Sequence, residues 1–368
     1  MKTRIDIGIL FSRSGPYRLL AEASYRGAMD AIAAINADPE RRIEIVGIVR
    51  DPAGNTDRYA SLCADILATS SARHIVGCTT SWSRKEVIPN LEKAGGTLWY
   101  ACPYEGFEAS EHVVYLHACP NQHLVPLLAH VLPRFGSRAF FVGSNYIWGW
   151  ETNRVARDVV GDVGGTVLGE RYLPLGDTDV ARLIEEIRAT RPNFILNNLI
   201  GPSSYAFFRA YGDLCRSDPA FSPRTCPILS CNLTEIELPE IGPSANGHLS
   251  VGPWFAASTT DAAPSPSASS FYAAAHSAVS VLADRLTDEI RGGAGAMAFS
   301  DRTFKTRLGP IRIDPNTHHT SLPVRIARAQ DGRFEVIEAE DGLVAPDPYL
   351  SRYDPARLMG RRTLRVVS

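Results

Sequence analysis

The stretch that decides the fold is His74-Ile75-Val76-Gly77-Cys78-Thr79-Thr80-Ser81, followed directly by Trp82-Ser83-Arg84-Lys85. A similar stretch comes next, Thr97-Leu98-Trp99-Tyr100-Ala101-Cys102-Pro103-Tyr104-Glu105-Gly106-Phe107. Each is a short apolar run typical of a buried strand, and each then breaks into hydroxyl, thiol or aromatic residues. In an open parallel sheet, ligands bind in the crevice beyond the carboxyl ends of the strands. The two stretches therefore predict one site, where the free N–H groups of a helix start favour a ligand oxygen.

Strand-like and helix-like segments alternate along the chain, which predicts βαβ units and parallel sheets. The expected strands are 5–11, 43–49, 74–78, 97–102, 113–117, 139–143, 166–172, 194–199, 227–231, 322–329 and 333–338. The expected helices are 18–36, 56–68, 83–93, 122–135, 149–163, 180–190, 203–214 and 270–291. Asn55 is the expected cap of the second helix, and Asp177 or Thr178 that of the sixth. Gln330-Asp331-Gly332 predicts a hairpin turn.

Length and composition indicate a two-domain globular protein. A chain of 368 residues is too long for one core of usual size. With a net charge of −2 and no run dense in Lys and Arg, no direct contact with nucleic acid is predicted. No apolar stretch approaches the roughly 18 residues of a membrane span, so no membrane insertion is expected. The strand-like start leaves no room for a signal peptide and predicts a cytoplasmic protein, or a periplasmic one if an upstream signal was removed.

The cysteines and histidines point to no cofactor. The seven cysteines form no Cys-x-x-Cys pair and no histidine cluster accompanies them, so neither a zinc site nor another metal site is predicted. Buried free thiols are the expected state, with a small disulfide loop between Cys226 and Cys231 as the alternative in an exported protein.

Several motifs carry a resemblance to a known family. The segments 76–85 (VGCTTSWSRK), 100–108 (YACPYEGFE) and 141–151 (FVGSNYIWGWE), with 7–15 and 346–349, resemble the amide-sensing regulators of aliphatic amidase operons. Those regulators belong to the type I periplasmic-binding-protein superfamily, with the branched-chain amino-acid and urea receptors. The resemblance implies an α/β fold of two doubly wound parallel-sheet lobes joined by three hinge crossings, near 119–121, 250–253 and 329. The expected lobes are 1–120 plus 252–329 and 121–251 plus 330–368.

The resemblance also implies a set of ligand-binding residues. They are Thr79, Thr80, Ser81, Tyr100, Cys102, Pro103, Tyr146, Trp148 and Asn232. Other interpretations stay open: Ser81 as a helix cap, Tyr100 as a core residue and Asn232 as a turn former. Tyr100 and Cys102 are two apart on a strand and so share a face. Arg84 and Lys85 are expected to be solvated surface charges.

This chain departs from the amide sensors at residues that shape the pocket. Thr79 stands where they have Tyr, and Cys102, a weaker hydrogen-bond donor, stands where they have Thr. Trp148 adds a flat apolar wall. Together these differences predict a ligand bulkier or more apolar than acetamide.

Three hypotheses about function follow. The first is a sensor that binds an amide or urea-like ligand in its cleft and controls amidase-type gene expression through an RNA-binding antiterminator held on its outer surface. The second is the substrate-binding component of an ABC importer for amides, urea or branched-chain amino acids. The third is a thiol enzyme with Cys102 or Cys78 as nucleophile; because no base stands beside either thiol and no catalytic motif occurs, a binding protein without chemistry is preferred. Whether copies of the chain associate is left open.

Overall fold

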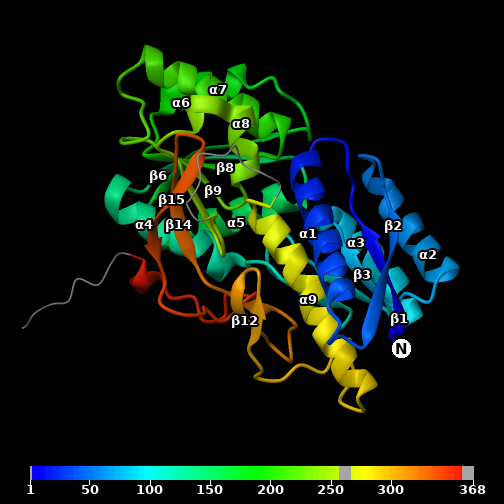
Figure 1. The fold of residues 1–368 in the computed structure, drawn as a ribbon. Helices are drawn as coiled ribbons and strands as arrows, with labels where there is room; N and C mark the ends of the chain where they lie inside the picture. Colours follow the sequence, from blue (N-terminus) through cyan, green and yellow to red (C-terminus); the bar gives the residue numbers. More distant parts are fainter. Residues whose placement is uncertain (1, 257–266, 359–368) are drawn as a thin grey trace, which may run out of the picture.

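The computed structural model describes residues 2–256 and 267–358, which fold into two α/β lobes (Figure 1). The predicted fold class is confirmed. The Ala-, Ser- and Pro-rich stretch at 257–266 lies outside the described residues. Within residues 2–256 and 267–358, no helix has both the length and the apolar character needed to cross a bilayer.

The first lobe is built on a parallel sheet with the strand order β2-β1-β3-β4-β5. Its strands are β1 (Thr3–Leu10), β2 (Ile43–Arg50), β3 (His74–Gly77), β4 (Thr97–Tyr100) and β5 (Val113–Tyr115). Successive apolar residues alternate between the two faces, so that Leu98 joins one core and Trp99 the other. Buried on both faces, these strands need continuous apolar runs, which is why the sequence reveals them.

Helices cover both faces of this sheet. The helices are α1 (Arg18–Ala37), α2 (Tyr59–Thr69), α3 (Ser81–Ala94) and α9 (Ser270–Ile290). Helix α9 comes from far along the chain and lies beside α1 (Figure 1). A small antiparallel sheet is formed by β11 (Phe304–Thr306), β12 (Gly309–Ile313) and β13 (Thr320–Ser321). It packs against the core that contains Trp99 and the buried side of α9.

The second lobe contains a seven-stranded sheet with the order β15-β14-β10-β9-β8-β6-β7. Its strands are β6 (Arg138–Ser144), β7 (Thr166–Leu173), β8 (Phe194–Asn198), β9 (Ile228–Ser230), β10 (Leu249–Gly252), β14 (Arg325–Gln330) and β15 (Arg333–Ala339). Its helices are α4 (Leu124–Phe135), α5 (Ile147–Asp162), α6 (Ala181–Thr190), α7 (Pro202–Ser217) and the short α8 (Leu238–Ile241). The apolar residues again alternate between two cores, with Phe140 in one and Phe141 in the other.

Most local expectations hold, and the exceptions have local causes. Asn55 accepts from the Asp57 backbone as expected, although it caps a 3₁₀ turn that precedes α2. The expected cap of α6 is wrong, because its N-cap is Val180, whose side chain makes no capping hydrogen bond. The hairpin is confirmed: β14 and β15 are joined by Asp331 and Gly332, both with positive φ, as a tight type I′ turn requires.

The chain crosses between the lobes three times: between β5 and α4, between β10 and α9, and between β13 and β14. The lobe boundaries expected from the sequence stay a prediction. Because β14 begins at Arg325 and pairs with β10 and β15, we propose that the third crossing lies at 322–324, ahead of the expected position at 329.

The two lobes touch at a glycine. Gly201, the residue before α7, has φ of +59°. A Cβ built on it would lie 1.8 Å from the carbonyl oxygen of Pro16, in the first-lobe loop after β1. Only a residue without a side chain lets these two backbones meet, so the observed closeness of the lobes depends on this glycine.

We predict that Gly201→Ala holds the lobes apart, because its methyl group occupies the space of the Pro16 carbonyl. Small-angle scattering of the variant should give a larger radius of gyration than the unmodified protein. Gly242→Ala is the matched control: Gly242 has nearly the same backbone angles as Gly201, but its Cβ would meet nothing within 4 Å. Both variants bear a strain of about 1–3 kcal/mol, and only the first should change the scattering. Identical curves for the two would contradict the prediction.

Candidate ligand-binding site

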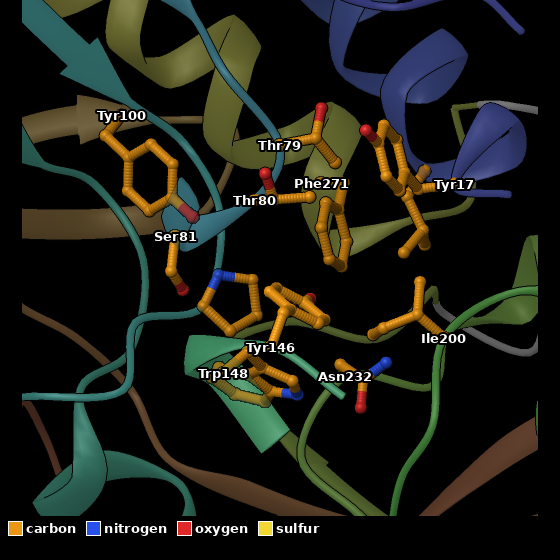
Figure 2. Close-up of a pocket in the computed structure, with 12 residues that line it drawn as sticks. Tyr17, Thr79, Thr80, Ser81, Tyr100, Tyr146, Trp148, Ile200, Asn232 and Phe271 are labelled. Carbon is orange, nitrogen blue, oxygen red and sulfur yellow. The ribbon is translucent and has the colours of Figure 1, made fainter. Parts of the chain in front are cut away.

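A pocket lies between the two lobes at the carboxyl ends of their strands (Figure 2). The pocket with its mouth holds about 350 Å³ of space free of protein atoms. The enclosed cavity within it is small, with a volume of about 20 Å³. The lining residues of the first lobe are Tyr17, Leu20, Thr79, Thr80, Ser81, Tyr100, Pro103 and Phe271, and those of the second are Tyr146, Trp148, Ile200 and Asn232. A ligand of more than a few atoms therefore needs the lobes or side chains to move apart as it enters.

Eight of the nine residues predicted from the sequence line this one pocket, and Cys102 does not. Its thiol is buried and donates to the carbonyl oxygen of Cys78 at 3.4 Å. Whether the eight bind a ligand stays a prediction. The sequence reasoning missed four lining residues. Tyr17 and Ile200 follow the carboxyl ends of β1 and β8, so the rule used for Ser81 could have found them, whereas Phe271 and Leu20 lie within helices and carry no such signal.

The start of α3 explains how Ser81 is presented. Thr80 is the N-cap, and its hydroxyl accepts a hydrogen bond from the Ser83 backbone N–H. The Ser83 hydroxyl in turn accepts one from the Thr80 backbone N–H. This capping box closes the helix start without Ser81. The interpretation of Ser81 as the cap is therefore wrong, and its hydroxyl is free for another role.

Arg84 overturns another expectation, because it is buried rather than solvated. Its guanidinium is fully shielded from solvent and lies 2.6 Å from Glu105 and 2.8 Å from Glu108. The rings of Tyr100 and Tyr104 stack on it, with centroids 4.9 and 4.8 Å away. This group of five residues, here called the Arg84 cluster, backs the wall of the pocket that carries Ser81, whose hydroxyl donates to Glu105 at 2.6 Å.

Lys85, the second charge expected at the surface, is exposed as expected and lies 2.5 Å from Glu108. Burial alone would raise the pKa of Glu108, but the positive charges of Arg84 and Lys85 outweigh burial and lower it to about 2. Burial likewise disfavours the charge on Arg84, yet Glu105 and Glu108 hold its pKa well above the usual value. Arg84 and Glu108 are therefore both charged at neutral pH.

The pocket itself carries no charged side chain. Five of its lining residues are aromatic: Tyr17, Tyr100, Tyr146, Trp148 and Phe271. Three buried polar atoms on its walls have no hydrogen-bond partner in the described structure, namely Tyr17 Oη, Thr79 Oγ1 and Trp148 Nε1. A buried polar atom without a partner is costly, so a bound ligand or water that reached one of these atoms would stabilise the protein.

The thiols show no sign of activation. All seven cysteines are unpaired, and burial raises the pKa to about 12 for Cys63, Cys119 and Cys226 and to about 11 for the half-buried Cys215. Burial shifts the pKa of Cys78, Cys102 and Cys231 upward still further. A cysteine nucleophile needs the opposite shift. Within the described residues, no group of three or more His, Cys, Asp and Glu is arranged to hold a metal ion.

Comparison with solved structures finds the same two-lobed architecture. A solute-binding protein of an ABC transporter from R. palustris, in complex with 4-hydroxybenzoate, shares 22% identity and a TM-score of 0.78, over 92% of this chain and 97% of that one. A second protein of this kind from R. palustris, in complex with benzoate, gives 15% and 0.79, over 94% and 98%. The branched-chain amino-acid transporter substrate-binding protein LivJ from Streptococcus pneumoniae, in complex with isoleucine, gives 18% and 0.75, over 94% and 100%.

Two lobes, three crossings and a pocket between the lobes define a binding protein of the hinged, two-lobe class. A family model described as "Periplasmic binding protein domain" matches residues 5–284 and 267–355. The chain belongs to this family. The narrower resemblance to amide-sensing regulators is not confirmed by these comparisons.

We predict that Glu108→Gln weakens the dependence of stability on acid pH. Because the folded pKa of Glu108 lies at about 2, below the ordinary value of 4.5, its stabilisation is complete above pH 4.5 and is lost as the pH falls towards 2. Between about pH 6 and about pH 3, the unmodified protein should lose about 2 kcal/mol more unfolding free energy than the variant. Urea unfolding at both pH values measures this difference, and an equal loss in the two proteins would contradict it.

Proposed function

We propose that this protein is the solute-binding component of an ABC importer and that its solute is a small, planar, uncharged aromatic compound. The observation that carries the proposal is the pocket between the lobes, whose walls present five aromatic rings and no charged side chain. Flat rings favour a flat ligand through stacked and edge-to-face contacts. A charged ligand would lose its hydration on entering the pocket and would find no side chain of opposite charge among the lining residues.

The relatives support this role over gene regulation. The three solved structures compared above are binding proteins of transporters, and the ligands in two of the three are benzoates. The sensor hypothesis rests on the motif resemblance at 76–85, 100–108 and 141–151 alone, so we retain it as the second candidate. In that case the antiterminator would bind the outer surface.

Binding and lobe closure are coupled by the position of the pocket. Ser81 and Tyr100 come from the first lobe, and Tyr146 and Trp148 from the second, so one small ligand contacts both lobes only when they are close (Figure 2). The ligand thereby stabilises the closed form. A permease that recognises both lobes would then distinguish loaded from empty protein.

A role in import requires the protein to work outside the cytoplasm, whereas a sensor that holds an antiterminator works inside it. Fractionating cells to find the location of the protein therefore separates the two candidate functions.

We predict that benzamide binds more tightly than acetamide, benzoate or isoleucine. The ring of benzamide packs against the aromatic side chains once the pocket has opened to admit it, whereas acetamide lacks that apolar area. The charged groups of benzoate and isoleucine meet no charged side chain in the lining. In thermal-shift measurements at equal concentration, the tightest ligand raises the melting temperature most. If isoleucine or acetamide gave the largest shift, the proposed ligand class would be wrong.

We further predict that Cys102→Thr leaves the order of these ligands unchanged, because Cys102 does not line the pocket and its thiol bonds to the Cys78 carbonyl. A change towards acetamide in the same thermal-shift panel would place residue 102 in contact with the ligand and contradict this prediction.

A further inference from the structure

We infer that Glu105, held in place by Arg84, is a positioning residue that makes Ser81 Oγ a hydrogen-bond acceptor towards the pocket. The site would then select a ligand group that carries an N–H or O–H over a carboxylate. This inference rests on the proposed function, because it names the polar chemistry of a ligand for the same pocket.

The first step concerns the proton of Ser81. Ser81 Oγ lies 2.6 Å from Glu105 Oε2, and both residues are 2% exposed. A serine hydroxyl has one proton to donate and lone pairs to accept with, whereas a carboxylate only accepts. The Ser81 proton is therefore directed to Glu105. What remains on Ser81 Oγ for a ligand is a lone pair.

The second step is that Glu105 is a fixed carboxylate. Arg84 Nη2 donates to its other oxygen, Oε1, at 2.6 Å. Arg84 is itself held on its edge by Glu108 and on its face by the rings of Tyr100 and Tyr104. An arginine held in this way stays protonated and keeps its hydrogen-bond acceptors oriented. Because Arg84 donates to one oxygen of Glu105 and Ser81 to the other, Glu105 cannot turn away from Ser81 without breaking the Arg84 cluster.

The third step concerns the group that fits. A ligand carboxylate at Ser81 would bring its lone pairs against that of Oγ, and no cation among the lining residues would compensate for this. An amide N–H₂ would donate to Ser81 Oγ instead. A primary aromatic amide therefore complements Ser81 Oγ, and a benzoate does not.

The test compares benzamide with benzoate, which have the same shape and differ in charge and in donors. Calorimetry should give a higher affinity for benzamide in the unmodified protein. Glu105→Gln should lower the ratio of benzamide to benzoate affinity by about tenfold or more. In this variant the Gln oxygen stays with Arg84, its N–H₂ donates to Ser81, and the Ser81 proton turns towards the pocket.

Glu108→Gln is the matched control. It removes the same charge from the same arginine, but the Gln oxygen can still accept from Arg84 Nε and keep the guanidinium in place. Glu108 makes no hydrogen bond to Ser81 in the described structure and does not line the pocket. The affinity ratio should stay as in the unmodified protein. An equal fall in both variants would show a general effect of charge and overturn the inference. So would an unchanged ratio in Glu105→Gln, or a fall of the same size when Glu105→Gln is made in a Ser81→Ala background.

A measurement without ligand separates this inference from the proposed function. Several buried serines donate hydrogen bonds, so NMR of protein labelled at serine should show several slowly exchanging hydroxyl protons. One of them should disappear in Ser81→Ala and in Glu105→Gln but persist in Glu108→Gln. Absence of that proton from the unmodified protein would overturn the positioning role. If the proton is present but neither benzamide nor benzoate binds, the positioning of Ser81 stands and the proposed class of ligand is wrong.

Discussion

The Arg84 guanidinium is fully buried, so its charge has to be balanced inside the protein, and the groups that balance it also shape the pocket. Glu105 and Glu108 follow β4, whereas Arg84 belongs to the first turns of α3. Their ion pairs tie the carboxyl ends of two neighbouring strands together. Removing one partner of such a buried pair leaves an uncompensated charge and costs about 3–5 kcal/mol. The wall that presents Ser81 is rigid for this reason.

Most of the fold and most of the residues that line the pocket could be predicted from the sequence, and one physical reason explains both. Strands buried on both faces must be apolar throughout, and the residues after their carboxyl ends meet at one edge of the sheet. The short strand β10 was missed because Leu249–Gly252 has only four residues and reads as part of a crossing. Cys102 was misplaced because β4 ends at Tyr100, so the alternation of a strand no longer sets the direction of the side chain at position 102.

The burial of Arg84 could not be read from its neighbours in the chain. Next to Lys85 and Glu86 it looks like one charge among several on a solvated helix turn. Its partners lie 21 and 24 positions away, and only the parallel pairing of β3 with β4 brings them close. The same holds for Gly201 and Pro16, whose closeness is a property of the two lobes together. Long-range pairing of this kind leaves no periodic pattern in a sequence.

The buried thiols bear on the compartment in which this chain can fold and persist. Disulfide exchange requires a thiolate, and the high pKa values of all seven cysteines keep thiolates scarce at neutral pH. Once the protein is folded, its thiols would stay unreacted in an oxidising environment and in a reducing one. An odd number of cysteines is therefore no argument for a reducing compartment here. The hazard of oxidation is confined to the unfolded chain.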